Sequence, residues 1–329
     1  MREDGLTKEC IDCGLCTEKC EFLNKYNINL KEFETEREDL AYNCFICGEC
    51  KINCPNEIDG RKIVLKMRER SSNNGQLESK KYFSTIFEKK NYLFKNYKYG
   101  RKKTVLFPGC NFPSFYPDTT RKLIRELREN ADIGVVFDCC GKPINELGLT
   151  KDADKIVNNI DGKLAKMGVE EIVTLCPNCY YFLKDKLNAN VTDIYKKLCE
   201  LGMESSLGVK QINVFTPCPD REEKLIRKSM EPFLAASDIT EIKDIQCCGL
   251  GGHGGVKEPE LSKNFVNKLK DKQLNNVYTY CASCCGNFNR NDIAGVKHIL
   301  CEIMQSDESP TKGIGSLINR AKFKFRLGL

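Results

Sequence analysis

Eighteen of the chain's 21 cysteines fall into four spaced groups, and this spacing constrains the fold and the chemistry more than any other feature. Two groups near the N-terminus share the spacing C-x2-C-x2-C-x3-C, and two later groups each combine a lone cysteine, an adjacent pair and a C-x-x-C pair. Thiolates at such spacings are soft ligands that suit iron and zinc. The sequence therefore predicts a metal protein with a role in electron transfer. The groups are Cys10, Cys13, Cys16 and Cys20; Cys44, Cys47, Cys50 and Cys54; Cys110, Cys139, Cys140, Cys176 and Cys179; and Cys218, Cys247, Cys248, Cys281 and Cys284.

Composition places the chain among folded proteins with metal sites. Its 329 residues suggest two or three domains, and its 41% hydrophobic and 30% charged content is ordinary for a globular protein. The sequence has no apolar run of ~18 residues and no secretory signal at its start. We therefore expect a cytoplasmic protein, at most peripheral to the inner face of the membrane. In that compartment, many cysteines indicate metal binding rather than disulfides.

The spacing of the first two groups predicts two [4Fe–4S] clusters. In such runs three thiolates bind one cluster and the fourth cysteine binds the other. We assign Cys10, Cys13, Cys16 and Cys54 to one cluster, and Cys44, Cys47, Cys50 and Cys20 to the other. Only the second run ends in the usual proline, Pro55, whereas Glu21 follows Cys20. Zinc is the alternative, but its ligand pairs are usually separated by a longer loop. Residues 1–75 are expected to form a mainly helical ferredoxin-type domain.

Two basic segments flank the later cysteine groups. Residues 80–103 contain nine lysines or arginines and one acid, Glu88, interleaved with aromatic residues. We expect residues 76–103 to form a linker with an amphipathic helix; docking to an acidic partner or membrane surface is the alternative. Nucleic-acid binding is not predicted, because no motif for it is present. The basic tail, residues 306–329, is expected to form a helix that packs on the core or contacts a membrane or partner. Its basic residues are Lys312, Arg320, Lys322, Lys324 and Arg326.

The two later groups belong to an internal repeat. Cys218, Cys247 and Cys248 follow their counterparts by 108 residues, and Cys281 and Cys284 follow theirs by 105 residues. Such a constant offset predicts two copies of one unit, at 104–210 and 211–305. Within the copies, short apolar runs alternate with amphipathic helical patterns, which favours α/β units with mostly parallel sheets. The expected strands are 105–107, 135–137, 172–175, 212–215 and 277–280, with a weaker one at 242–245. The expected helices include those around 123–127, 153–167, 225–230 and 261–269.

The lone and paired cysteines follow strand candidates closely, so each set of five is predicted to converge at the carboxyl edge of its sheet. Gly141 and Gly249, which follow the adjacent pairs, allow the backbone to approach the metal group. Five thiolates exceed the four that a cubane cluster requires. Such a set suggests an open or distorted cluster that can bind a substrate sulfur.

The remaining cysteines and the two histidines are less informative. Cys199 and Cys301 are expected to be buried structural thiols, and Cys285 is either a spare ligand or another structural thiol. His253 is a candidate proton donor near a cluster, with a loop residue of no catalytic role as the alternative. His298 is expected to be structural. Because the sequence has no dinucleotide fingerprint, any flavin or nicotinamide would belong to a partner.

The cysteine-rich sets, with Cys-Cys-Gly at 139–141 and 247–249, resemble the paired CCG domains of heterodisulfide reductase. The whole layout is similar to a form in which the small iron–sulfur subunit is fused to the catalytic one. The resemblance implies two noncubane [4Fe–4S] clusters, one for each set of five cysteines, that reduce a disulfide in an anaerobic metabolism. Some relatives carry zinc at one such site, so the metal at the first set stays open.

A similar layout occurs in iron–sulfur subunits of complexes that oxidise glycolate, lactate or glycerol 3-phosphate. We therefore predict an iron–sulfur oxidoreductase that passes electrons from two cubanes to the CCG clusters and reduces a disulfide-type substrate. The alternative is an electron-transfer subunit for a flavin-dependent dehydrogenase. The expected partners are a ferredoxin or a flavin-containing subunit and a small sulfur substrate.

Overall fold

The computed structural model describes residues 5–293 and 295–325, so Arg326 of the basic tail lies outside the described residues. The chain forms two compact units, each assembled from three separate segments. Unit 1 contains the chain up to Phe87 together with Pro143–Ala153 and Asp244–Lys272. Unit 2 contains Glu88–Lys142, Asp154–Lys243 and the chain from Gln273 onwards. The repeats therefore contribute segments to both units.

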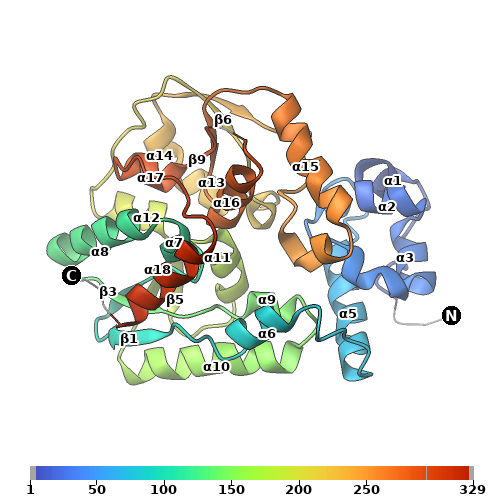
Figure 1. Cartoon of the computed structure of the whole chain (residues 1–329), viewed down its shortest axis with the longest axis horizontal. Helices are drawn as coiled ribbons and strands as arrows, with labels where there is room; N and C mark the ends of the chain where they lie inside the picture. Colours follow the sequence, from blue (N-terminus) through green and yellow to red (C-terminus); the bar gives the residue numbers. More distant parts are fainter. Residues whose placement is uncertain (1–4, 294, 326–329) are drawn as a thin grey trace. The chain divides into compact units, whose positions relative to one another are not determined.

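Unit 1 is built from short helices around the two N-terminal cysteine runs (Figure 1). Helices α1 and α4 begin after Gly14 and Gly48, whose left-handed backbone turns the chain directly after a cysteine. Helix α3 begins with a capping box between Asn29 and Glu32. The elements are α1 (Leu15–Lys19), α2 (Glu21–Tyr26), α3 (Leu30–Glu36), the 3-10 helix η1 (Glu38–Asn43), α4 (Glu49–Ile52), α5 (Gly60–Asn73), the 3-10 helix η3 (Gly251–Val256) and α15 (Pro259–Asp271).

A buried arginine joins the segments of unit 1. The side chain of Arg68, on α5, is fully buried and donates hydrogen bonds to four carbonyl oxygens at 2.6–2.9 Å. Its guanidinium also lies over the Tyr42 ring, 4.9 Å from the centroid. The four acceptors are the carbonyl oxygens of Ala41, Cys44, Glu146 and Gly252. One side chain therefore satisfies backbone groups from distant parts of the sequence.

Unit 2 contains two small sheets. The first has the strand order β1-β3-β2-β4-β5 and is parallel except for the β1–β3 pair. The second has the order β7-β6-β8-β9 and is entirely parallel. The strands are β1 (Asn96–Tyr99), β2 (Thr104–Phe107), β3 (Gly134–Phe137), β4 (Glu171–Thr174), β5 (Asn190–Asp193), β6 (Gln211–Val214), β7 (Asp238–Glu241), β8 (Val277–Thr279) and β9 (Lys297–His298).

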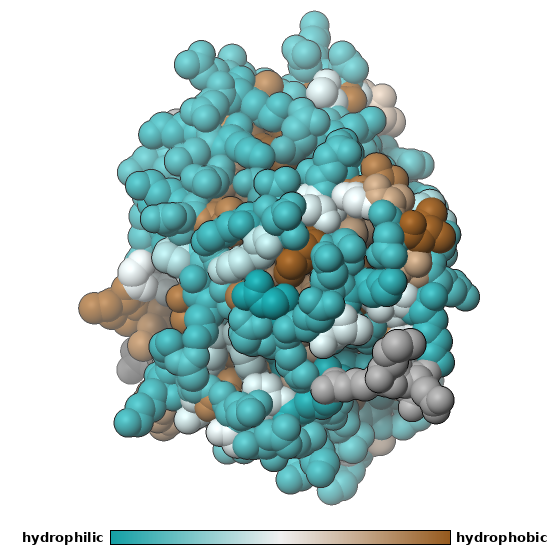
Figure 2. Space-filling view, turned by 90° about the vertical axis from the view of Figure 1, so that its right-hand side faces the viewer, coloured by the Kyte–Doolittle hydropathy of each residue, from teal (hydrophilic) through white to brown (hydrophobic). Residues whose placement is uncertain are grey.

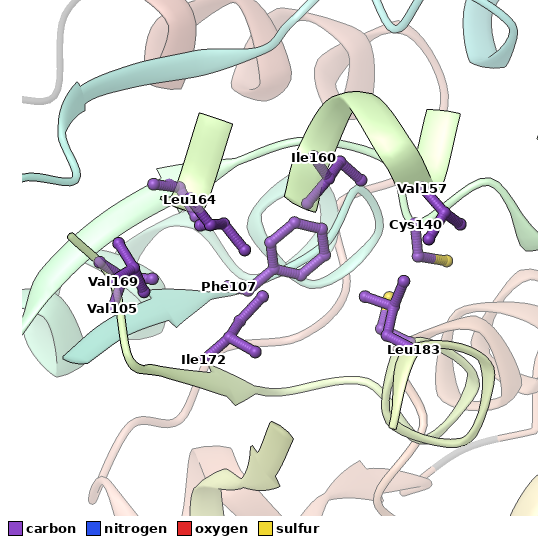
Figure 3. Packing of buried hydrophobic residues seen from close by; sticks show 11 residues of the cluster. Val105, Phe107, Cys140, Val157, Ile160, Leu164, Val169, Ile172 and Leu183 are labelled. Atoms are coloured by element: carbon purple, nitrogen blue, oxygen red, sulfur yellow. The ribbon is translucent and has the colours of Figure 1, made fainter. Parts of the chain in front are cut away.

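Helices cover these sheets and form apolar cores with them. In the core of the first sheet, Val105, Phe107 and Ile172 pack against Ile160 and residues near it on α10 (Figure 3). The helices with residues in unit 2 are α6 (Phe83–Lys89), α7 (Phe112–Phe115), α8 (Pro117–Ala131), α9 (Lys142–Asn145), α10 (Thr150–Lys166), α11 (Pro177–Leu183), α12 (Ile194–Glu200), the 3-10 helix η2 (Cys218–Asp220), α13 (Leu225–Ser229), α14 (Glu231–Leu234), α16 (Ala282–Arg290), α17 (Ile299–Ile303) and α18 (Ile314–Phe325). Of these, α6, α9 and α10 also contain residues of unit 1.

The predicted fold class is confirmed: a mainly helical region precedes α/β repeats with small, mostly parallel sheets. Two local predictions are wrong. The weak strand at 242–245 is displaced to β7, because this half-exposed edge strand carries only isolated apolar residues. The segment 80–103 is helical only over α6; after it, residues 96–99 form strand β1, which pairs antiparallel with β3.

The surface offers little contiguous apolar area on the face that Figure 2 presents, where hydrophobic patches are small and separate. In the ranges 5–293 and 295–325, none of the helices is both long and apolar enough to cross a membrane.

Candidate metal centres

The first ferredoxin-type site is a pocket in unit 1 into which both N-terminal runs bring cysteines. Cys10, Cys13 and Cys16 line this pocket together with Cys54 of the second run. These are the four residues assigned to one cluster from the spacing rule. Asp12 lies beside them, and its carboxylate accepts a hydrogen bond from the Cys10 thiol at 3.6 Å.

The second ferredoxin-type site gathers the other four cysteines. Burial raises the pKa of the Cys50 thiol, and the charges of Cys20 and Cys44 raise it further. These two cysteines therefore lie close to Cys50. Burial also raises the pKa of Cys20 to about 12. The Nε2 atom of Gln246 donates to the sulfurs of both Cys20 and Cys47, at 3.9 and 3.7 Å. Both predicted quartets are thus brought together within unit 1, although binding of a cluster to either stays a prediction.

The first set of five cysteines forms a continuous series of thiol contacts in unit 2. Hydrogen bonds from the Cys139 and Cys179 thiols lower the pKa of Cys140, and a hydrogen bond to Cys139 raises that of Cys110. Cys176 contacts Cys179 and also Cys281, which belongs to the second set. Cys281 in turn contacts Cys284. The order of contacts is Cys110, Cys139, Cys140, Cys179, Cys176, Cys281 and Cys284. The two repeats therefore meet at a pair of sulfur atoms.

A buried lysine and a partly buried arginine lie beside the start of this series. Lys89, from the predicted linker, and Arg320, from the tail, both pair with Glu88. Burial lowers the pKa of each cation, but the neighbouring Cys110 thiol and Glu88 raise it above the ordinary value. Cys139 contributes to the same rise at Lys89. Both basic segments thus supply positive charge where several thiolates would gather.

Asparagines hold the loops of the two repeats together in unit 2. Asn111 accepts a hydrogen bond from Arg320 at 3.3 Å and donates to the Ser283 hydroxyl at 2.7 Å. Asn178 donates to the Cys281 sulfur at 3.9 Å. Because Asn111 follows Cys110 and Ser283 lies between Cys281 and Cys284, these bonds fix the cysteine loops against one another.

The second set of five is shared between the units. Cys218, Cys281 and Cys284 belong to unit 2, whereas Cys247 and Cys248 belong to unit 1. In unit 2, the buried carboxylate of Asp220 accepts hydrogen bonds from the Tyr181 and Tyr280 hydroxyls, both at 2.6 Å, which anchors the loop after Cys218. Convergence of this set on one point stays a prediction. Because β7 ends at residue 241, Cys247 follows its strand by six residues rather than about three.

The two glycines that follow the adjacent cysteine pairs have a positive φ, a backbone conformation that favours glycine. Gly141 and Gly249 have φ values of +90° and +88°. The N–H of Gly249 points to the Cys247 sulfur at 3.2 Å, and a Cβ at this position would lie 2.8 Å from the Ser262 carbonyl oxygen. A side chain at Gly249 would therefore displace the loop that carries Cys247 and Cys248.

The histidines lie in different surroundings. His253 contacts the Pro143 carbonyl oxygen through Nε2 at 3.2 Å and the edge of the Tyr82 ring, both within unit 1. Its role as a proton donor stays a prediction. His298 is buried, which lowers its pKa to about 3, and its Nδ1 atom accepts the Leu300 N–H at the start of α17. A neutral, helix-capping imidazole agrees with the structural role expected for it.

The cysteines outside the four groups bond to ordinary partners. The Cys285 thiol donates to the Val296 carbonyl oxygen at 3.3 Å and accepts from Asn289. The Cys301 sulfur accepts from Thr119 at 3.6 Å. Cys301 is buried as predicted, but the predicted burial of Cys199 is wrong, because this residue lies half-buried on α12. Cys285 is held by its own helix and the adjacent loop; a role as a spare ligand stays a hypothesis.

The donor sets suit iron–sulfur clusters. Among the residues that the structure describes, no three cysteine, histidine or carboxylate side chains surround one point as they would a single ion. A four-iron cluster binds each thiolate at a different iron, so its ligands enclose a larger volume than those of one ion. Two four-thiol sets in unit 1 and a five-thiol set in unit 2 match the soft ligands that such clusters require.

Comparison with known proteins agrees with this geometry. Residues 9–59 match the model of the 4Fe-4S dicluster domain, and residues 104–184 and 212–289 each match the model of the cysteine-rich domain known as CCG. The chain thus belongs to the iron–sulfur proteins that join a ferredoxin-type dicluster domain to duplicated CCG domains.

Three relatives show the extent of the likeness. An uncharacterized iron–sulfur protein of Methanococcus maripaludis is 25% identical over 84% of this chain and 66% of its own length. The glycolate oxidase iron–sulfur subunit of Escherichia coli is 21% identical over 84% of this chain and 86% of its own. One component of the ferredoxin:CoB-CoM heterodisulfide reductase of Methanosarcina acetivorans is 30% identical over 24% of this chain and 36% of its own. The chain spans about two thirds of the Methanococcus relative.

Sequence patterns identified the cysteines but missed the residues around them. Gln246 bonds to two cysteine sulfurs, and Lys89 and Arg320 lie beside Cys110, yet none of them belongs to a recognisable motif. One signal was present in the sequence: Glu21 occupies a position where proline is usual.

Proposed function

We propose that this chain is an iron–sulfur oxidoreductase subunit that receives electrons at the two sites of unit 1 and uses them at its CCG sites to reduce a disulfide-type substrate. The observation that carries the proposal is the series of thiol contacts from Cys110 to Cys284. It gathers five cysteines of one repeat and two of the other, which is more than a simple cubane needs.

Three of the cysteine sets would each hold one metal centre. Cys10, Cys13, Cys16 and Cys54 would hold one [4Fe–4S] cluster and Cys44, Cys47, Cys50 and Cys20 the other, while Cys110 and its four partners would hold the first CCG centre. When bound, such groups accept and donate single electrons. Lys89 and Arg320 would offset the negative charge of the thiolates beside Cys110.

The overall reaction balances and is favourable. One disulfide bond breaks, two electrons and two protons are taken up, and two thiols form. A plant-type ferredoxin near −400 mV lies about 130 mV below thioredoxin at about −270 mV. At about 1.4 kcal/mol for each 30 mV, a low-potential ferredoxin donor would provide about 6 kcal/mol.

A second candidate function is an electron relay for a flavoprotein dehydrogenase. It is favoured by the glycolate oxidase iron–sulfur subunit, whose likeness extends over 84% of this chain and 86% of the relative. In such a relay the same cysteines would hold clusters, but no disulfide would be reduced, and electrons would arrive from a partner's flavin.

Anaerobic purification followed by iron and sulfide analysis tests the proposal. Four occupied sites correspond to about sixteen irons per chain. The protein should then oxidise reduced methyl viologen when a small organic disulfide is added, and EPR after thiol oxidation should show a paramagnetic signal. Cys139→Ser should abolish both, whereas Cys199→Ser, outside the four groups, should leave them unchanged. About eight irons and no disulfide-dependent oxidation would favour the relay.

A further inference from the structure

A single glutamine links the second ferredoxin-type site to the loop that carries the Cys-Cys-Gly of the second repeat. Gln246 is 5% exposed and directly precedes Cys247. The Nε2 atom of its amide lies 3.9 Å from the Cys20 sulfur and 3.7 Å from the Cys47 sulfur. Each of the two amide hydrogens therefore has one sulfur acceptor. No feature of the cysteine motifs requires a glutamine at this position.

A backbone N–H fixes which end of the amide faces the sulfurs. The N–H of Glu21 donates to Oε1 of Gln246 at 2.8 Å, so Nε2 must point the other way, toward Cys20 and Cys47. A proline after Cys20 would have no N–H to give. Glu21, which stands where proline is usual, therefore supplies the backbone N–H that orients the Gln246 amide.

Hydrogen bonds to cluster sulfurs raise a cluster's reduction potential, because they stabilise the more negative, reduced state. At the first ferredoxin-type site the Cys10 sulfur instead faces a carboxylate, Asp12. Each site also has an ion-paired carboxylate, Asp12 with Lys31 and Asp59 with Arg61, both at 3.0 Å, near Cys10 and Cys50 respectively. These charges largely offset one another between the sites. The second site also has the buried Arg68 guanidinium near Cys44 and the Ile46 N–H 3.3 Å from the Cys44 sulfur. Both act in the same direction as the Gln246 amide, which faces two of the four sulfurs.

We propose that Gln246, oriented by the Glu21 N–H, is a positioning residue that raises the reduction potential of the cluster held by Cys20, Cys44, Cys47 and Cys50 above that of its neighbour. The inference rests on the proposed function, since it requires clusters at both sites. It gives electron flow a direction: the first site is the entry, and the second is the exit, next to the loop of Cys247.

The test measures two midpoint potentials by EPR-monitored redox titration of the whole chain. In Gln246→Leu the equilibrium constant for one-electron reduction of the second cluster should fall about tenfold, which is about 59 mV, while the first cluster is unchanged. Gln76→Leu, at an exposed position of unit 1, is the control and should change neither potential.

A second pair of variants separates the orienting bond from the side chain of Glu21. Glu21→Pro removes the N–H at the first position of α2, where proline is tolerated, and should lower the same potential by a smaller factor. Glu21→Ala keeps the N–H but loses the ion pair with Lys268, and it should have no effect. If leucine at 246 prevented the second cluster from assembling, this pair would decide the question.

Unchanged potentials in both Gln246→Leu and Glu21→Pro, with both clusters present, would overturn this proposal alone. An equal shift of both clusters would also overturn it, because it would indicate a general structural change. A wild-type chain without the two clusters would overturn the proposed function as well, and iron analysis distinguishes that result from the others.

Discussion

The cysteine sites of unit 1 and unit 2 solve the same electrostatic problem in different ways. In unit 1 the ligands come from two runs of eleven residues each; the amide of Gln246 faces two of their sulfurs, and the buried Arg68 near Cys44 bonds to backbone carbonyls. In unit 2 the ligands come from loops up to 69 residues apart, and the ion-paired cations Lys89 and Arg320 lie beside them. In unit 1 the support is thus a neutral amide and an arginine bonded to the backbone, whereas in unit 2 ion-paired cations from outside the repeats lie beside the thiols.

The largest difference should appear when the metal is removed. Helices α1–α4 have only four to seven residues and are too short to be stable alone, whereas β2–β5 share a packed apolar core. Anaerobic chelation should therefore abolish amide protection in α1–α4 and leave that of β2–β5 largely intact, as followed by hydrogen exchange. Equal loss of amide protection in α1–α4 and in β2–β5 would contradict this prediction.

A large stability effect is expected at Arg68. In Arg68→Met, four buried carbonyl oxygens lose their donor, which should lower the free energy of unfolding of unit 1 by about 3–5 kcal/mol. Urea denaturation followed by circular dichroism measures this change. Arg70→Met on the same helix breaks only a half-exposed ion pair with Glu38 and should change stability by less than about 1 kcal/mol.

The charge compensation in unit 2 should affect metal retention more than stability. Lys89→Met removes a cation beside Cys110 and Cys139 and should weaken metal binding at the first CCG site about 10–100-fold, measured as iron retained against a competing chelator. Lys90→Met, at the exposed neighbouring position, is the matched control. Equal retention in the two variants would show that the buried charge is not needed.

The smallest effect is expected at Glu258 in unit 1. Its carboxylate accepts hydrogen bonds from Lys25, Tyr26 and Asn43, and these bonds hold its pKa below the ordinary value against the opposing effect of burial. Glu258→Gln should lower the free energy of unfolding by about 1–2 kcal/mol at pH 7.

The same carboxylate makes the difference depend on pH. Because its pKa is depressed in the folded state, its contribution is present above the unfolded pKa of about 4.3 and is lost as pH falls through the folded pKa. Unfolding of wild type and Glu258→Gln at pH 7 and below pH 4 should therefore show a smaller gap at low pH. A constant gap would indicate that the ionised form is not what stabilises unit 1.

Sequence reasoning predicted the features that rest on spacing and periodicity. The quartets of unit 1 follow from fixed intervals, and strands such as β2 and β4 are nearly continuous apolar runs. The edge strands β1, β5 and β9 were not predicted and β7 was misplaced, because short, partly exposed strands lack that signal. Lys89, Arg320 and Gln246 could not be assigned, because their roles depend on which distant segments the fold brings beside a thiol.

The contact between Cys176 and Cys281 has an evolutionary consequence. Duplicated halves usually drift apart, since each can accept changes that the other does not feel. Here a substitution that moves the loop of Cys176 or of Cys281 would also move a sulfur atom that the other repeat contacts directly. Substitutions in one repeat are therefore expected to require compensating substitutions in the other.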